Sequence, residues 1–162
     1  MSFNIRLETN ETVSSHNWSY RKAACITMIK DQEPTIIGFQ EAIYNSQWAY
    51  LKEQLSDEYT GFGVGRDDGD TQGECTGILY RKDDVEKIDG GTFWLSEDPD
   101  IPSKGWGGTY YRSATWGIFK LKATEQYFVY INTHLEVNSS SIRAKEMDLI
   151  VDKFAEYNPN DY

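Results

Sequence analysis

The sequence of 162 residues is poor in the residue types that make redox and multi-histidine sites. It has two cysteines, Cys25 and Cys75, and their spacing matches no metal-ligand or redox motif. We interpret them as two partly buried free thiols, and a disulfide between them is left open. The only histidines are His16 and His134. His16 lies in a Ser- and Asn-rich loop, where we expect a solvated surface side chain.

Long apolar runs and basic side chains are also scarce. No run approaches about 18 apolar residues, so we expect no membrane span. Met1 leads at once into a strand-like segment, so we expect no signal peptide in this chain. Localisation is left open, including a secreted or periplasmic parent with a trimmed N-terminus. Sixteen Lys and Arg against 26 Asp and Glu give a formal charge of −10. This charge disfavours nonspecific nucleic-acid binding, which depends on phosphate neutralisation.

What the chain does contain is typical of one globular domain, with 39% hydrophobic and 14% aromatic residues. A short apolar run at 35–42 ends near a lone acid, Glu41, and predicts a buried strand that carries this carboxylate to the rim of a sheet. A solvated Glu41 at the start of the next helix is the alternative. Four other polar residues also lie where a predicted strand meets a loop, a common place for functional groups: Asn4, Glu74, Arg112 and His134.

Helical spacing appears in three segments. The first runs from a cap at Ser19 to about residue 31, with an apolar stripe of Ala24, Cys25, Met28 and Ile29. The second carries Trp48, Leu51 and Leu55 on one face. The third is capped near Ser139, with a predicted buried stripe of Met147, Ile150, Val151 and Phe154. Strands are predicted at 61–65, 77–81 and 85–95, followed by a hairpin of strands 115–121 and 126–133.

Two loops have compositions that invite a functional interpretation. Asp67, Asp68 and Asp70 form an acidic cluster, but the loop lacks the length and terminal Glu of an EF-hand, so we expect a solvated turn. The long loop at 97–111 is the kind that often carries function. Aromatic side chains in and beside it either line a substrate cleft or pack on the loop itself: Trp94, Trp106, Tyr110 and Tyr111.

Five segments, taken in order, resemble the endonuclease/exonuclease/phosphatase superfamily with its deoxyribonuclease I-like fold. They are Ser-Phe-Asn-Ile-Arg at 2–6, Ile-Gly-Phe-Gln-Glu-Ala at 37–42, Gly-Glu-Cys-Thr-Gly-Ile-Leu-Tyr at 73–80, Arg-Ser-Ala-Thr-Trp at 112–116 and Ile-Asn-Thr-His-Leu at 131–135. The resemblance implies an α+β fold, a four-layer α/β/β/α sandwich. Residues 1–162 would be a single, truncated domain comprising about the N-terminal half to two-thirds of it.

The resemblance also implies roles for the residues at the strand ends. Glu41 would bind Mg²⁺ or Mn²⁺, assisted by Asn4, because hard divalent ions take oxygen ligands. Arg112 would contact the phosphate of a phosphoester substrate, and His134 would face that phosphate as an acid or hydrogen-bond donor. Glu74 would orient His134. Asn132 would help to hold the site, whereas Arg143 is explained equally well by an ion pair with Glu146 or Glu136.

The sequence departs from the family pattern in one respect. The family's later Gly-Asp-x-Asn and Ser-Asp-His segments, which complete the metal and phosphate site, are not in residues 1–162. We therefore expect a phosphodiesterase or phosphatase parent and little activity from this segment alone. An exposed sheet face would favour self-association or a complementing C-terminal half. The alternative is a non-catalytic binding module that uses the aromatic loop at 94–111.

Overall fold

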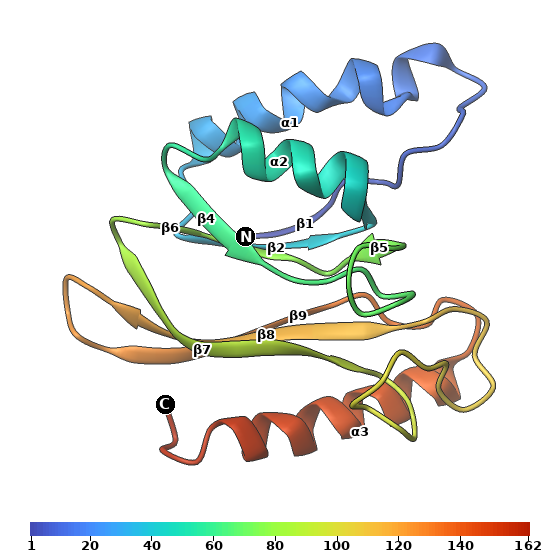
Figure 1. Ribbon diagram of the computed structural model, residues 1–162, viewed down its shortest axis with the longest axis vertical. Coiled ribbons are helices and arrows are strands. Elements are labelled where there is room, and N and C mark those ends of the chain that lie inside the picture. Colours follow the sequence, from blue (N-terminus) through green and yellow to red (C-terminus); the bar gives the residue numbers. More distant parts are fainter.

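The computed structural model describes residues 1–162, which form four layers in the order helix, sheet, sheet, helix (Figure 1). Helices α1 (Trp18–Gln32) and α2 (Ala49–Gln54) cover one sheet, and α3 (Ser140–Tyr157) covers the other. Two short helical turns, the 3-10 turn η1 (Ser14–His16) and the π turn η2 (Tyr44–Trp48), precede α1 and α2. The predicted α+β, α/β/β/α arrangement is confirmed. None of the helices is long and apolar enough to cross a membrane.

The first sheet has the strand order β1-β2-β6-β4. Its strands are β1 (Ser2–Asn4), β2 (Ile36–Gln40), β6 (Ile78–Arg81) and β4 (Tyr59–Phe62). β1 is parallel to β2, and β6 is antiparallel to both of its neighbours. A separate antiparallel pair, β3 (Ala42–Ile43) and β5 (Glu74–Cys75), extends from one end of this sheet.

The second sheet is an antiparallel meander of β7 (Val85–Trp94), β8 (Ser113–Leu121) and β9 (Tyr127–Thr133), with a bulge between Lys87 and Asp89. The predicted hairpin is confirmed. The strand predicted at 61–65 was misplaced, because β4 ends at Phe62. Gly63 follows with φ of 140°, and a Cβ there would lie 2.8 Å from Cys75 Sγ, so the chain turns away at a residue that only glycine suits.

Three apolar clusters hold the layers together. The largest lies between the helices and the first sheet and includes the fully buried Ile29, Phe39 and Trp48. A second joins α3 to the other sheet, and a third joins the two sheets around Ile78 and Phe119. Trp48, Leu51 and Leu55 are all buried, as their spacing predicts.

The two sheets already cover each other within residues 1–162. The accessible surface is 8330 Å², and a compact monomer of this mass, 18.7 kDa, is expected to expose about 8,300 Å². The premise that one sheet would present a bare apolar face is therefore wrong. Self-association stays a prediction, and light scattering at micromolar concentration is the measurement that tests it.

The buried face of α3 differs from the predicted stripe. Only Ile150 of the four predicted residues is buried, while Met147, Val151 and Phe154 are 44%, 61% and 39% exposed. The helix turns the face bearing Glu146, Ile150 and Tyr157 to the sheet. The Tyr157 ring stacks on Trp116 with centroids 3.8 Å apart, and Glu146 accepts a hydrogen bond from the backbone of Glu136, so these contacts set the rotation of the helix. The cap at Ser139 is confirmed, since its Oγ accepts from Ile142 N.

Helix α1 also differs from its prediction in two details. It begins at Trp18 with Asn17 in the cap position, rather than with Ser19. Ala24, predicted to lie in the apolar stripe, is exposed, and the buried residues are Trp18, Ile26 and Ile29. The predicted apolar stripe is therefore rotated about the helix axis relative to the face that is buried in the structure.

Candidate active site

Most of the predicted site residues lie around one cavity at the end of the sandwich where β5 and the loop at 95–112 are found, at the right of Figure 1. The cavity has a volume of about 380 Å³, within the usual range of ligand sites. Its lining residues come from six separate segments of the chain: Leu7, Glu41, Arg66, Glu74, Tyr110, Arg112, His134 and Val137.

Glu41 follows β2 directly and enters the cavity with the backbone in the left-handed region, at φ of 62°. Its Oε1 accepts from Asn4 Nδ2 at 2.8 Å, and its Oε2 accepts from Leu7 N at 2.9 Å. Burial on its own would raise the pKa of Glu41. The hydrogen bonds from Asn4 and Leu7, with the nearby His134 and Arg6, outweigh this and lower the pKa. Glu41 is thus a strand-end carboxylate that stays charged, not a residue that opens a helix.

The donors at Glu41 and Asn4 match the needs of a hard divalent cation. Mg²⁺ is held in proteins by one or two carboxylates and retains several waters. Glu41 offers a charged carboxylate, and Asn4 offers an amide oxygen that at present accepts from Arg6 N at 2.9 Å. The chain has no group of three or more His, Cys, Asp or Glu side chains that could hold a metal. Glu41 and Asn4 are therefore the residues here that could offer oxygen ligands to a divalent ion.

His134 follows β9 and is 28% exposed. Its Nδ1 lies 3.3 Å from Arg112 Nη1, and its Nε2 lies 4.0 Å from Glu41 Oε1. The imidazole therefore stands between the arginine side of the cavity and the Glu41 side. The sequence correctly predicted His134 at the end of a strand.

Glu74 lies beside His134, so its orienting role stays a prediction, but no hydrogen bond joins the two side chains. Its Oε2 is 3.7 Å from His134 Nδ1, whereas both of its oxygens accept from Arg66, at 2.9 and 2.8 Å. This bidentate pair is formed by two largely buried side chains, 11% and 13% exposed. Arg66 is a site residue that the sequence did not reveal, because it appeared only as the first residue of an acidic turn.

The other side of the cavity is rich in guanidinium groups. Arg112 is 5% exposed, and its Nε has no hydrogen-bond partner. The nearest carboxylate oxygen, Glu136 Oε2, is 3.9 Å away and is also without a hydrogen bond. Burial and the neighbouring charge of Arg66 lower the pKa of Arg112. The exposed ring of Tyr110 covers both arginines, with its centroid 5.1 Å from Arg112 Cζ and 5.8 Å from Arg66 Cζ.

Asn132 lies behind the cavity rather than in its lining. Its Nδ2 donates to the carbonyls of Phe39, Thr76 and Gly77, and its Oδ1 accepts from Gln40 Nε2 at 2.6 Å. The side chain is 4% exposed and connects the second sheet to the ends of β2 and β6. The structure thus gives Asn132 a supporting position, two residues before His134.

Several other predictions are settled by the side chains. Arg143 donates to the carbonyls of Glu136 and Val137 and forms no ion pair with either predicted glutamate. Cys25 and Cys75 are both free thiols, as expected, and burial raises the pKa of Cys75 to about 12.

The structure also decides between the interpretations of the two candidate loops. In the acidic loop, Asp68 accepts from the backbone N–H groups of Asp70 and Gln72, which makes a turn. The aromatic side chains of the second loop divide between the two interpretations. Tyr110 lines the cavity, whereas Trp94 is buried and donates to the carbonyl of Arg66. Trp106 lines a separate groove beside α3.

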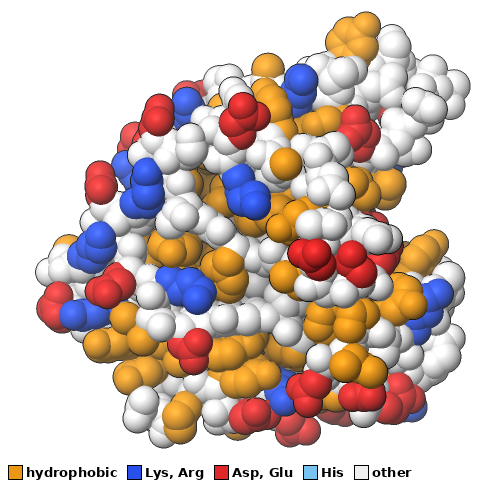
Figure 2. Space-filling model, viewed as in Figure 1, with side chains coloured by type: hydrophobic (Ala, Val, Ile, Leu, Met, Phe, Trp, Pro, Cys, Tyr) orange, Lys and Arg blue, Asp and Glu red, His pale blue; other side chains and the backbone are white.

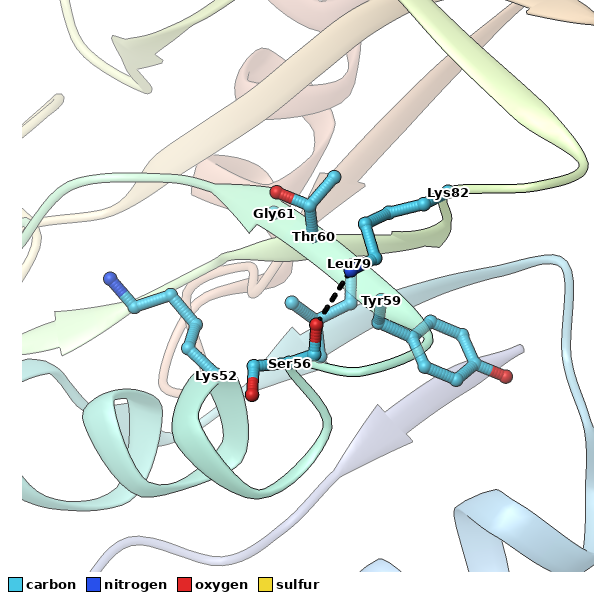
Figure 3. Close-up of a pocket in the computed structure, with 7 residues that line it drawn as sticks. All are labelled: Lys52, Ser56, Tyr59, Thr60, Gly61, Leu79 and Lys82. Carbon is cyan, nitrogen blue, oxygen red and sulfur yellow. Dashed lines mark hydrogen bonds between the residues drawn. The ribbon is translucent and has the colours of Figure 1, made fainter.

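A second hollow lies away from this site, against the edge strand β4 (Figure 3). It has a volume of about 200 Å³ and contains two lysines, Lys52 and Lys82, but no acid or histidine. Lys82 Nζ donates to the carbonyl of Ser56 across it, as the dashed line in Figure 3 shows. It offers no acid–base pair, whereas the cavity around Glu41 brings carboxylates, a guanidinium and an imidazole together and is the candidate active site.

Comparison with known proteins agrees with this arrangement. The endonuclease/exonuclease/phosphatase from Bacteroides vulgatus is 44% identical, with a TM-score of 0.90 over 96% of this chain and 59% of that one. A mannosyl-6-phosphatase from Bacteroides thetaiotaomicron is 35% identical, with a TM-score of 0.89 over 97% of this chain and 58% of that one. An uncharacterised mimivirus protein is 26% identical over 141 residues, 80% of this chain and 50% of its own length. No family model matches the chain.

The four layers and the end-on cavity define a deoxyribonuclease I-like fold, which more distant structures such as D. rerio TDP2 share at 21% identity and a TM-score of 0.71. The chain belongs to the endonuclease/exonuclease/phosphatase superfamily, as the five sequence segments indicated. It spans 58–59% of the length of the two Bacteroides proteins described above. The fold and family are thus established over a segment that matches just under three fifths of each of these relatives.

Proposed function

We propose that residues 1–162 carry part of a single catalytic domain that hydrolyses phosphoesters with the help of a divalent metal. The observation that supports this most is the convergence of a charged carboxylate, a buried guanidinium and an imidazole on one cavity. Glu41 follows β2, Arg112 precedes β8 and His134 follows β9, yet all three line the same 380 Å³ space. A metal-binding oxygen, a phosphate-binding fork and a proton-carrying ring are the parts that such a reaction needs.

In this proposal Glu41 and Asn4 hold Mg²⁺ or Mn²⁺. When bound, such an ion neutralises charge on phosphoryl oxygens and helps to orient the substrate. Arg112 binds the phosphate through the guanidinium atoms that face the cavity, and its burial keeps this charge weakly screened. His134 donates to an oxygen of the phosphate or of the leaving group. Glu74 and Arg66 support the imidazole side of the site, and Asn132 fixes the strand end that carries His134.

A sugar phosphate is the substrate class that we favour. The 35%-identical relative is a mannosyl-6-phosphatase, and the exposed face of Tyr110 gives the cavity an aromatic wall of the kind on which a sugar ring packs. The net charge of −10 disfavours a long polyanion. In the view of Figure 2, acidic side chains gather along the lower edge over α3, while basic ones are dispersed.

The segment spans only part of its relatives, so the direct test measures metal binding as well as turnover. We expect the 162-residue chain to bind Mn²⁺ in a calorimetric titration, and Glu41→Gln to weaken this binding by about tenfold or more, the scale seen for altered metal-site residues. Glu86→Gln, an exposed acid on β7 outside the cavity, is the matched control. Equal Mn²⁺ affinity in all three proteins would refute the assignment of Glu41.

Turnover separates the enzyme from a binding module. We expect the 162-residue chain to hydrolyse mannose 6-phosphate slowly or not at all, and a protein extended by the family's Gly-Asp-x-Asn and Ser-Asp-His segments to do so with Mn²⁺ or Mg²⁺. Glu41→Gln should abolish hydrolysis in the extended protein. Binding of mannose 6-phosphate without turnover, and without any effect of Glu41→Gln, would instead favour a non-catalytic module that uses residues 94–111.

A further inference from the structure

The ion pair between Arg66 and Glu74 changes what Glu74 can do for His134. Each carboxylate oxygen of Glu74 accepts from a different nitrogen of Arg66, at 2.9 and 2.8 Å. Arg66 is itself fixed by its backbone, because its N–H donates to the carbonyl of Glu74 at 2.9 Å and its carbonyl accepts from Trp94 Nε1 at 2.7 Å. The carboxylate is therefore directed at Arg66, and its nearer oxygen stays 3.7 Å from His134 Nδ1.

Arg112, a hydrogen-bond donor, lies closer to His134 Nδ1 than Glu74 does. Arg112 Nη1 lies 3.3 Å from this nitrogen. A guanidinium has only donors and stays protonated in proteins, so a hydrogen bond between them requires Nδ1 to be the acceptor. A neutral imidazole carries one proton. With Nδ1 as acceptor, that proton is on Nε2.

A carboxylate at Nδ1 would have the opposite effect. It accepts but does not donate, so it would select the tautomer with the proton on Nδ1, and Nε2 would become the acceptor. The partner of Nδ1 therefore decides the tautomer of His134. With Arg112 as the partner the proton is on Nε2, and with Glu74 as the partner it is on Nδ1.

We propose that Arg66 is a positioning residue which, by holding both oxygens of Glu74, leaves His134 Nδ1 to Arg112 and so fixes neutral His134 with its proton on Nε2. Arg66 thus acts on the imidazole through Glu74, without touching it.

The consequence for catalysis rests on the proposed function. Nε2 is the ring nitrogen on the Glu41 side of the cavity, 4.0 Å from Glu41 Oε1. With a proton there, neutral His134 is a hydrogen-bond donor to an anionic oxygen bound in the cavity. It cannot act as a base at Nε2 in this state, so water activation would come from another group.

The test reads the tautomer directly and needs neither metal nor substrate. The chain has two histidines, so ¹⁵N-histidine labelling gives two imidazole spin systems, and His16→Gln assigns them. Long-range ¹H–¹⁵N spectra at about pH 9, where imidazoles are neutral, distinguish a protonated from an unprotonated ring nitrogen. For His134 we expect protonated Nε2 and unprotonated Nδ1.

Variants at Arg66 then test the cause. Arg66→Met frees Glu74, and we expect the proton of His134 to move to Nδ1, with the unprotonated signal appearing at Nε2. Arg66→Lys keeps one contact to Glu74 and should give a mixture of both tautomers. Arg81→Met is the matched control, because Arg81 also lies near several carboxylates but at the opposite end of β6 from the cavity, and it should leave the spectrum unchanged.

Two results would overturn the proposal. One is a proton on Nδ1 in the unaltered chain. The other is an unchanged tautomer in folded Arg66→Met, with folding checked by circular dichroism. If Arg66→Met fails to fold, Arg66→Lys decides, because a tautomer unchanged from that of the unaltered chain would contradict the proposal. Failure of Mn²⁺ to bind would count against the proposed function and leave this result untouched.

Discussion

Glu41 and Glu74 lie on two sides of one cavity and are held in different ways. Glu41 accepts from two neutral donors, the Asn4 amide and the Leu7 backbone, so its negative charge is stabilised but not cancelled. Glu74 accepts twice from Arg66, a cation, so its charge is neutralised within the protein. Two carboxylates at strand ends are thus prepared for different partners. In the proposed function, Glu41 would bind the metal ion, whereas Glu74 would position its neighbours.

Removing the partner of each carboxylate should produce unequal losses of stability. Arg66→Met leaves the largely buried Glu74 without its cation, and we expect the free energy of unfolding to fall by about 2–3 kcal/mol, since loss of one member of a buried pair is costly. Asn4→Ala leaves Glu41 with the Leu7 N–H and solvent, and should cost about 1 kcal/mol. Urea unfolding of both variants measures the two losses. Equal losses would contradict the view that Glu74 depends more strongly on its partner than Glu41 does.

The same two variants should also differ in their effect on metal affinity. Asn4→Ala removes an oxygen donor and the amide that orients Glu41, so Mn²⁺ binding should weaken by about tenfold. Arg66→Met removes a positive charge from the cavity and releases that of Glu74, so Mn²⁺ should bind as tightly as before or more tightly. Calorimetric titration of each variant measures the change in Mn²⁺ affinity. A tenfold loss of affinity in Arg66→Met would contradict the role of Arg66 in neutralising Glu74.

The smallest expected effect concerns pH. The pKa of Glu41 is lowered in the folded protein, so the unfolded chain takes up a proton first as the pH falls. Its contribution to stability is therefore complete above the usual value of 4.5 and is lost as the pH falls through the lower folded value. Thermal unfolding of the unaltered chain and of Glu41→Gln should differ at pH 6 and converge in acid. A gap that widens in acid would mean that the pKa shift has the opposite sign.

The sequence predicted the side chains at strand ends well, because their positions depend on local pattern. Glu41, Arg112 and His134 follow or precede apolar strands of the expected period, and parallel or adjacent strands bring such ends together. The pairing of Arg66 with Glu74 could not be predicted in this way. It requires the intervening loop to return on itself, which the backbone bond between the two residues records.

The rotation of α3 shows a second limit. The predicted and the observed faces both have helical spacing, and Ile150 belongs to both. What selects between them is tertiary: the stack of Tyr157 on Trp116 and the bond from Glu136 to Glu146. A stripe of Met147, Val151 and Phe154 remains on the outside, so hydrophobicity alone indicated the wrong side of the helix.

The left-handed backbone at Glu41 has an evolutionary consequence. A residue with a Cβ is strained there by roughly 1 kcal/mol or more, and glycine and asparagine tolerate this conformation best. A library screened only for stability should therefore accept Gly or Asn at position 41, and one screened for metal binding should keep Glu. The carboxylate thus stands against the local conformational preference of the chain, and its loss in the stability screen would show that only function requires it.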